Sequence, residues 1–251
     1  MIPLKVRHYP GRAAVAAVLL IAANSIIFIF QSVGGLEKTV SEYGLIPYFV
    51  THPFTSEITV RQTVPVAIRW GRPIVGIREV PVYRPRPGPW GSLITSIFLH
   101  GDWFHLILNM LFLWVFGRSV EIRFGPFRFL FFYFLCGLGA SLTHVLFHPS
   151  ATVPMVGASG AVSGVMGAFF ILYPYTRVVT LLPFFFFFHL VELPAFLFLG
   201  IWFLFQLLSI GSPSDVAFLA HVGGFIIGLA LAPRFARRKP CRPPFTSREF
   251  H

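Results

Sequence analysis

The stretch MVGASGAVSGVMGAFFILY, residues 155–173, places small residues at helical spacing inside an apolar segment. These small residues form two adjacent rows: Gly160, Gly164 and Ala168, with Ser159, Ser163 and Gly167 beside them. Residues four apart share one face of a helix, and a face of small residues lets a second helix approach closely within a membrane. We therefore predict a closely packed transmembrane helix over about Ser159–Tyr173.

Five further apolar segments flank this one along the chain. A bilayer core is crossed by roughly 20 apolar helical residues. Segments near that length run over about Ala13–Phe30, Trp103–Phe116, Phe127–Phe147, part of Leu190–Leu208, and Val216–Leu231. Only 12% of the residues are charged, against about 25% in soluble domains. The predicted fold class is an all-α membrane protein, a bundle of six transmembrane helices with a long external loop between the first two.

The first apolar segment has a second interpretation, a cleaved signal peptide. Its length and the lack of an A-x-A cleavage site before residues 31–35 favour a membrane span instead. The predicted organisation is then a cytoplasmic N-terminus (1–12), the first transmembrane helix (13–30), an external loop insertion (31–92), a membrane core (93–232) and a basic cytoplasmic tail (233–251).

The basic residues determine the predicted topology. The net charge is +11, but no polar stretch interleaves basic and aromatic residues, which argues against nucleic-acid binding and for contact with the lipid bilayer. Short loops rich in Lys and Arg stay on the cytoplasmic side, so we expect both termini in the cytoplasm. The loop 31–92 carries six Arg, all between residues 61 and 86; a loop of this length can translocate despite its charge.

Polar residues inside apolar spans are costly and indicate functional sites. His105 and Asn109 lie on one face of the second span, Ser159 begins the fourth, and His221 lies in the sixth on the face of Gly224 and Gly228. With alternating spans, all four fall near the outer membrane surface. Close packing of the fourth and sixth spans, through Gly160 and the glycines of the sixth, would bring Ser159 near His221.

This set of residues is suited to acyl transfer. A serine hydroxyl needs a base to become a nucleophile, and His221 is the only histidine of its span. The backbone N–H of Ser159, His105 and the Asn109 amide are candidate donors for the oxyanion. The second, fourth and sixth spans contain no Asp or Glu that could orient the histidine, so we expect a Ser159–His221 dyad.

The same inventory argues against other protease classes. An aspartyl intramembrane protease needs two carboxylates within its spans, whereas Glu121, Glu192 and Asp215 are expected near the interfaces. A zinc protease needs HExxH or a similar pair, which the chain lacks. No metal or cofactor is therefore predicted. The two cysteines, Cys136 and Cys241, fall in different phases and are not expected to pair.

At this point the chain resembles the rhomboid family of intramembrane serine proteases. The matching elements are GASG (157–160) for GxSG, HLILN (105–109) for HxxxN, AHVGG (220–224) for AHxxGG, and Phe116-Gly117 with Glu121 in the loop after the second span. The resemblance covers about residues 90–232, and three motifs in order make it specific.

The resemblance implies a six-helix core with a water-filled cavity open to the outer side, where transmembrane segments of other proteins are cleaved. It implies Ser159 and His221 as the dyad, His105 and Asn109 in the oxyanion hole, and structural roles for Gly157, Gly160, Gly224, Gly228 and Glu121. The fifth span would be a mobile gate for the substrate helix. Ser163 departs from the pattern, because some members have a tyrosine there that stacks on the histidine. A bacterial inner (cytoplasmic) membrane is the expected location.

Three other interpretations compete with a protease. A non-catalytic rhomboid-like protein would bind membrane clients for quality control, although such relatives usually lack the serine or the histidine. A transporter or channel would spread polar residues through the bilayer depth, whereas here they gather at one end. A metal site built from His100, His144 and His148 is the third, and these histidines are better explained as interfacial. The substrate and the oligomeric state are not predicted.

Overall fold

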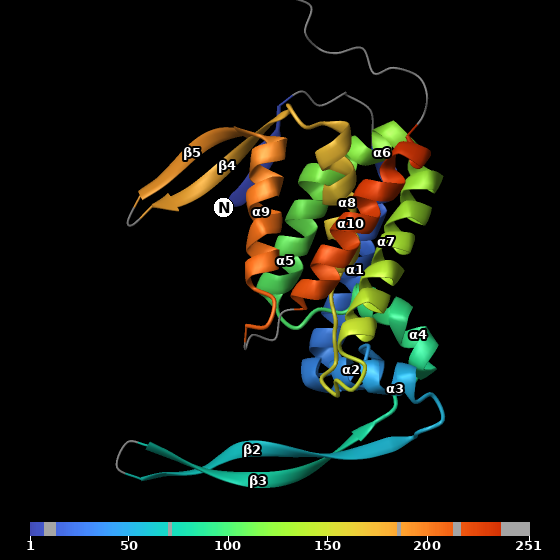
Figure 1. The fold of residues 1–251 in the computed structure, drawn as a ribbon, viewed down its shortest axis with the longest axis vertical. Helices are drawn as coiled ribbons and strands as arrows, with labels where there is room; N and C mark the ends of the chain where they lie inside the picture. Colours follow the sequence, from blue (N-terminus) through green and yellow to red (C-terminus); the bar gives the residue numbers. More distant parts are fainter. Residues whose placement is uncertain (8–13, 70–71, 185–186, 213–216, 237–251) are drawn as a thin grey trace, which may run out of the picture.

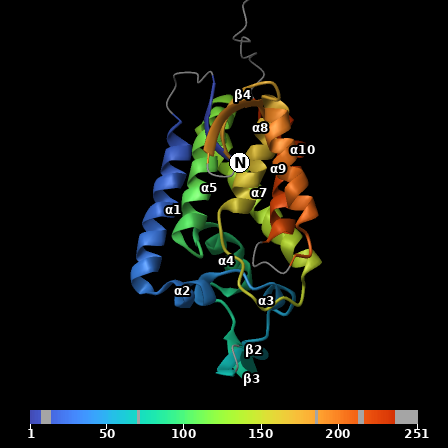
Figure 2. The same cartoon turned by 90° about the vertical axis from the view of Figure 1, so that its left-hand side faces the viewer.

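Helix α8 (Ser159–Leu172) lies at the centre of a helical bundle in the computed structural model (Figures 1 and 2). The structure describes residues 1–7, 14–69, 72–184, 187–212 and 217–236. Ten consecutive residues of α8, from Gly160 to Phe169, are buried. Around it lie α1 (Val15–Gly34), α5 (Trp103–Phe112), α7 (Pro126–Phe147), α9 (Ala195–Leu208) and α10 (Phe218–Phe235). The predicted central helix is thus present, with its expected start.

Within the described ranges, four helical segments are long and apolar enough to cross a membrane. They are Val15–Gly34, Trp103–Phe124, Pro126–Phe147 and Phe218–Phe235. Helices α8 and α9 are apolar but have 14 residues each, which gives about 21 Å of helix against a hydrocarbon core of about 30 Å. The membrane bundle is therefore supported, while six crossings stay a prediction.

The second span is longer than predicted. Helix α5 continues through a π-helical turn, η2 (Leu113–Gly117), into α6 (Arg118–Phe124), whereas the sequence suggested an end near Phe116. The charged residues of α6 were assigned to a loop, but Glu121 is only 3% exposed and accepts two backbone hydrogen bonds from α1. A partnered carboxylate can be buried, so the helix continues past the charges.

Two glycine-lined helices form the tightest contact of the bundle. A Cβ at Gly224 of α10 would collide with the carbonyl oxygen of Gly160, and one at Gly228 with that of Gly164. A Cβ at Gly167 of α8 would collide with the carbonyl oxygen of Phe225. Backbone therefore packs on backbone along the two stripes that the sequence pointed out, as small residues permit.

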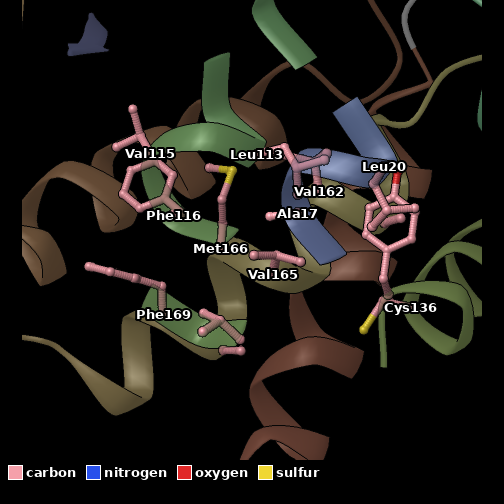
Figure 3. Packing of buried hydrophobic residues seen from close by; sticks show 14 of the residues in the cluster. Ala17, Leu20, Leu113, Val115, Phe116, Cys136, Val162, Val165, Met166 and Phe169 are labelled. Atoms are coloured by element: carbon pink, nitrogen blue, oxygen red, sulfur yellow. The ribbon is translucent and has the colours of Figure 1, made fainter. Parts of the chain in front are cut away.

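Phenylalanine fills much of the rest of the interior. Phe116, Phe124, Phe129, Phe132, Phe169 and Phe198 are fully buried. Figure 3 shows Phe116 and Phe169 with Met166 and Val165 in this cluster, and the Phe116 and Phe169 rings meet edge to face at 5.1 Å. Cys136 lies in the same cluster as a free buried thiol, and Cys241 is outside the described residues.

The chain contains two antiparallel sheets besides its helices. It is therefore mostly helical, which corrects the predicted all-α fold class. At one end of the bundle, β1 (Ile2–Val6), β4 (Arg177–Phe184) and β5 (Phe187–Pro194) form an antiparallel sheet in the order β1-β4-β5. At the other end, β2 (Glu57–Arg69) and β3 (Arg72–Tyr83) form a long hairpin (Figure 1). Backbone pairing, which composition did not suggest, satisfies the polar groups of these segments.

The inserted region after α1 is folded. It holds α2 (Leu36–Tyr43), α3 (Pro47–Thr51), the β2–β3 hairpin and the start of α4 (Gly88–Thr95), which leads into a 3-10 turn, η1 (Ser96–Phe98). In the Pro/Arg-rich stretch Val80–Trp90, β3 runs to Tyr83 and α4 begins at Gly88. Asp215 and most of the predicted tail 233–251 lie outside the described residues.

Candidate functional site

Three helix N-termini meet at one end of the bundle. Ser159 is the first residue of α8, His105 is the third of α5 and His221 is the fourth of α10. All three helices begin at the end from which the β2–β3 hairpin projects (Figure 1). The first backbone N–H groups of a helix lack partners within it and carry positive potential. This end therefore collects a hydroxyl, two imidazoles and free N–H donors.

Gly157 positions the serine against the first histidine. A Cβ built on Gly157 would lie 2.8 Å from Nε2 of His105 and 3.4 Å from Oγ of Ser159. Only a residue without a side chain leaves this space open, and φ of +130° at Gly157 also favours glycine. The backbone N–H of Gly157 donates to the carbonyl of Ser96 at 2.8 Å, which ties the turn to η1.

Two hydrogen bonds at the start of α5 involve His105, one to its backbone and one to its ring. Asp102 caps the helix, its Oδ1 accepting from the backbone N–H of His105 at 2.8 Å. The backbone N–H of Gly101 donates to Nδ1 of His105 over a long 3.4 Å. Because Nδ1 accepts, the proton of the neutral ring sits on Nε2, the atom that faces Gly157. His105 thus presents a donor on the side of Ser159.

Asn109 lies one turn further along α5 and is 6% exposed. Its Nδ2 donates to the carbonyl of His105 at 3.0 Å. An amide group has two N–H donors, so one remains for another acceptor. The structure therefore keeps Asn109 on the same helix face as His105, with half of its donor capacity used within the helix.

His221 is held close to α8 by the glycine contact of α10. Its neighbour Ala220 has its carbonyl oxygen 3.9 Å from a Cβ built at Gly160, the residue after Ser159. Among the described residues, no hydrogen bond joins the side chains of Ser159 and His221. Nδ1 of His221 instead bonds to Oε1 of Gln206 at 2.8 Å. The histidine of α10 thus has a partner on α9.

Sequence reasoning missed Gln206 and Trp202 as neighbours of His221. The Trp202 ring centre lies 6.2 Å from that of His221, with the planes 34° apart, so α9 supplies an aromatic neighbour where Ser163 offers none. Ser163 Oγ instead donates to the Ser159 carbonyl at 2.6 Å. The missed signal was Gln206 itself, the only amide side chain in the apolar fifth span.

A third histidine is buried beside the site. His100 has no exposed surface, neither ring nitrogen has a hydrogen-bond partner, and its ring meets His105 edge to face at 5.1 Å. Burial lowers the pKa of His100 to about 3, so the ring is neutral near pH 7. Gln31 of α1 holds its backbone, donating to the carbonyl at 2.8 Å and accepting from the N–H at 3.2 Å. The start of α5 is thereby fixed to α1.

The inserted region braces the loop that precedes Ser159. Leu45 and Met155 exchange backbone hydrogen bonds of 3.0 and 2.7 Å, and the N–H of Tyr48 donates to the carbonyl of Ala151 at 3.0 Å. Thr51 Oγ1 adds a bond of 2.9 Å to the carbonyl of Pro149. The region after α1 thus supports the segment that carries the GASG turn.

Glu121 lies far from this end of the bundle. Its two carboxylate oxygens accept from the backbone N–H groups of Ala16 and Ala17 at 2.9 and 2.7 Å, in the first turn of α1. A carboxylate at a helix N-terminus complements the free N–H groups and the dipole. The contact joins α6 to the start of α1, and the structural role assigned to Glu121 stays a prediction. Among the described residues, no cluster of three His, Cys, Asp or Glu side chains is arranged to hold a metal.

The comparisons with known proteins agree with the three motifs. The model of the Rhomboid domain matches residues 87–238. The chain is 42% identical over 81 residues to Rhomboid protease GluP of Bacillus subtilis (strain 168), which is 32% of this chain and 15% of that protein. It is 40% identical over 89 residues to Rhomboid-like protein 11, chloroplastic, of Arabidopsis thaliana (36% of this chain, 31% of that protein). With Rhomboid protein 1, mitochondrial, of Saccharomyces cerevisiae it shares 36% identity over 92 residues (35% and 27%). The matched region therefore covers less than a third of each relative.

Proposed function

This chain belongs to the rhomboid family, and we propose that it is an intramembrane serine endopeptidase that cleaves peptide bonds in or near transmembrane segments of other membrane proteins. One relative is named a protease. The observation that carries the proposal is the space at Gly157, bounded by Ser159 Oγ on one side and His105 Nε2 on the other. A nucleophile and an oxyanion donor around one open point is the arrangement that acyl transfer needs.

In the proposed reaction, Ser159 is the nucleophile and His221 the general base. The Oγ–H proton moves to Nε2 of His221 while Oγ bonds to the scissile carbonyl carbon, and the carbonyl π electrons move onto its oxygen. Nε2–H then gives its proton to the leaving amine as the C–N bond breaks. Water, deprotonated by the same nitrogen, then attacks the acyl carbon; the C–Oγ bond breaks, Nε2–H returns its proton to Oγ, and the carboxylic acid product leaves.

The developing oxyanion is proposed to lie at the N-terminus of α8. The backbone N–H of Ser159, Nε2–H of His105 and the second N–H of the Asn109 amide are the donors. Removing one such donor typically costs about 10²–10³ in rate. The free N–H groups of the α8 terminus add positive potential at the same point. Gly160, Gly224 and Gly228 serve this arrangement by letting α8 and α10 touch.

The proposed setting is a multi-pass protein with this end of the bundle toward the outer side of a bacterial inner membrane and both termini in the cytoplasm. In that setting the β2–β3 hairpin and the helices of residues 31–92 form the external insertion, and 93–232 form the catalytic core. Substrates would be transmembrane proteins that reach the site from the bilayer.

The experiment is cleavage of tagged single-span substrates by the reconstituted protein. Ser159→Ala and His221→Ala should each abolish cleavage, and Ser159→Ala should abolish labelling by a serine-directed phosphonate. Ser163→Ala, one turn along the same helix, and His148→Ala, an exposed histidine, are the matched controls and should keep activity. Cleavage that survives Ser159→Ala would refute the assigned nucleophile. If the wild-type protein neither cleaves these substrates nor reacts with the phosphonate, the result would favour a non-catalytic protein that binds membrane clients.

A further inference from the structure

The hydrogen bond between α9 and His221 selects one form of the imidazole. Nδ1 of His221 lies 2.8 Å from Oε1 of Gln206. An amide oxygen only accepts, so Nδ1 must carry the proton of the neutral ring. Nε2 is then left with a free lone pair, which is the form required of a base. His105 has the opposite form, because its Nδ1 accepts from the Gly101 N–H and its Nε2 carries the proton.

The residues around Gln206 on α9 are apolar, so its amide needs a hydrogen-bond partner. The residues next to it, Phe205 and Leu207, are 59% and 41% exposed on an apolar helix that faces lipid in the proposed setting. An amide in such a helix is costly unless it has a partner. Within the part of the chain that the structure describes, the hydrogen-bond partner of Gln206 is His221.

Helix α9 holds the ring from more than one point. Trp202, four residues before Gln206 and so on the same helix face, lies beside the imidazole with ring centres 6.2 Å apart. Phe218 of α10 meets the ring edge-on at 6.3 Å. Among the described residues, the other titratable groups near His221 are His105 from α5 and His144 from α7. Neither is a carboxylate, and the acceptor that Nδ1 contacts in this part of the chain is Oε1 of Gln206.

The second half of α9 has fewer buried side chains than the first half. Its fully buried residues, Ala195, Phe198 and Leu199, all lie in the first five positions, near the β4–β5 sheet. Beyond Leu199 the described helix has exposed or half-buried side chains only. Two rings of this segment still contact α10, because Trp202 and Phe203 lie 5.9 and 4.7 Å from the ring centre of Phe225. The position of Gln206 beside His221 therefore depends on this contact between α9 and α10.

From these observations we infer that Gln206 is a positioning residue for His221: it holds the histidine in the form that accepts the serine proton, and does so while α9 is packed against α10. This inference rests on the proposed function, since it assigns the role of the base to His221. It replaces a two-residue dyad by a Ser159–His221–Gln206 chain whose third member comes from the fifth span. Displacing the outer end of α9 breaks the bond and removes the orientation of the base.

The test compares Gln206→Met, which keeps the length and removes the acceptor, with Gln206→Glu, which keeps an accepting oxygen. Leu207→Met on the neighbouring position is the control. We expect Gln206→Met to lower kcat about 10- to 100-fold with KM within about twofold, as for lost orientation of a general base, and Gln206→Glu to recover most of the loss. Gln206→Met with kcat within twofold of wild type would overturn the inference, as would equal losses in both variants.

A second measurement is independent of protease activity. Nitrogen-15 NMR of histidine-labelled full-length protein in lipid nanodiscs, with His221 assigned from the His221→Asn variant, reports which ring nitrogen carries the proton. We expect the Nδ1–H form in wild type and in Leu207→Met. In Gln206→Met its ratio to the Nε2–H form should fall about fivefold, as for one neutral hydrogen bond. An unchanged ratio would refute the positioning role even in a protein that cleaves nothing, so its failure is separable from that of the proposed function.

Discussion

Replacing Gly224 by alanine should push α10 away from α8 at the level of the site. The added methyl would collide with the carbonyl oxygen of Gly160, lie 3.1 Å from its carbonyl carbon and lie 3.4 Å from Cβ of Ala140. Two of these atoms belong to the backbone, so no rotamer change relieves the contact. The helices must separate, and Gly160 and Gly224 are one and three residues away from Ser159 and His221.

The magnitude follows from two opposing effects. Overpacking of a well-packed interior costs about 1–3 kcal/mol, and a backbone obstacle places Gly224→Ala toward the upper end. Alanine regains about 1 kcal/mol of helix propensity over glycine. We expect a net loss of about 1–2 kcal/mol in the free energy of unfolding. A displacement on the order of 1 Å between reacting groups can cost about 10²-fold in rate. We therefore expect the cleavage rate to fall by about that factor in a protein that still folds.

The matched control is Gly200→Ala on α9, where an added Cβ meets nothing within 4 Å. That variant should be unchanged or up to about 1 kcal/mol more stable. The assay is unfolding of both variants in mixed detergent micelles, with cleavage and phosphonate labelling measured on the same samples. If Gly224→Ala has the same free energy of unfolding as Gly200→Ala and reacts with the phosphonate at the wild-type rate, the claim that backbone contact positions the site is wrong.

Three further variants test single contacts. Gly157→Ala should abolish cleavage while stability falls by about 1–3 kcal/mol, because its methyl would fill the space beside His105; normal cleavage in a folded protein would contradict this. Glu121→Ala removes the acceptor for two backbone N–H groups of α1 and should lower the unfolding free energy by about 1–3 kcal/mol, seen in detergent unfolding, with Glu121→Gln showing a smaller loss; equal stability of wild type and Glu121→Ala would speak against the cap. Gln31→Leu leaves the backbone of His100 without two hydrogen bonds and should speed amide exchange at the start of α5 by roughly tenfold; unchanged exchange there would dismiss this anchor.

Local patterns carried the prediction of the family and of the central helix. The small residues of 159–168 indicated a helix contact, and the structure contains it as backbone packing between α8 and α10. The rhomboid resemblance, based on three short motifs, is confirmed by the family match over residues 87–238. Such features are readable because helical periodicity and motif spacing are properties of neighbouring residues. The roles assigned to Ser159, His221, His105 and Asn109 stay predictions.

Features that join distant parts of the chain were not predicted. The extension of the second span into α6 depends on Glu121 meeting the start of α1 more than a hundred residues earlier. The bracing of the GASG turn depends on pairing between Leu45 and Met155. Neither pairing has a local signature, because any backbone N–H and C=O can bond once the fold brings them together.

The sequence by itself determined that the chain is a membrane protein, which segments are apolar, and that a serine and two histidines begin helices at one depth. These properties follow from hydrophobicity and helical period, which act along the chain. Only the tertiary structure decided that α9 sets Gln206 against His221, that residues 45–51 support the loop before Ser159, and that the chain is mostly rather than wholly helical. Those outcomes depend on which surfaces pack, and hydrogen-bond partners in a low-dielectric interior are selected by that packing.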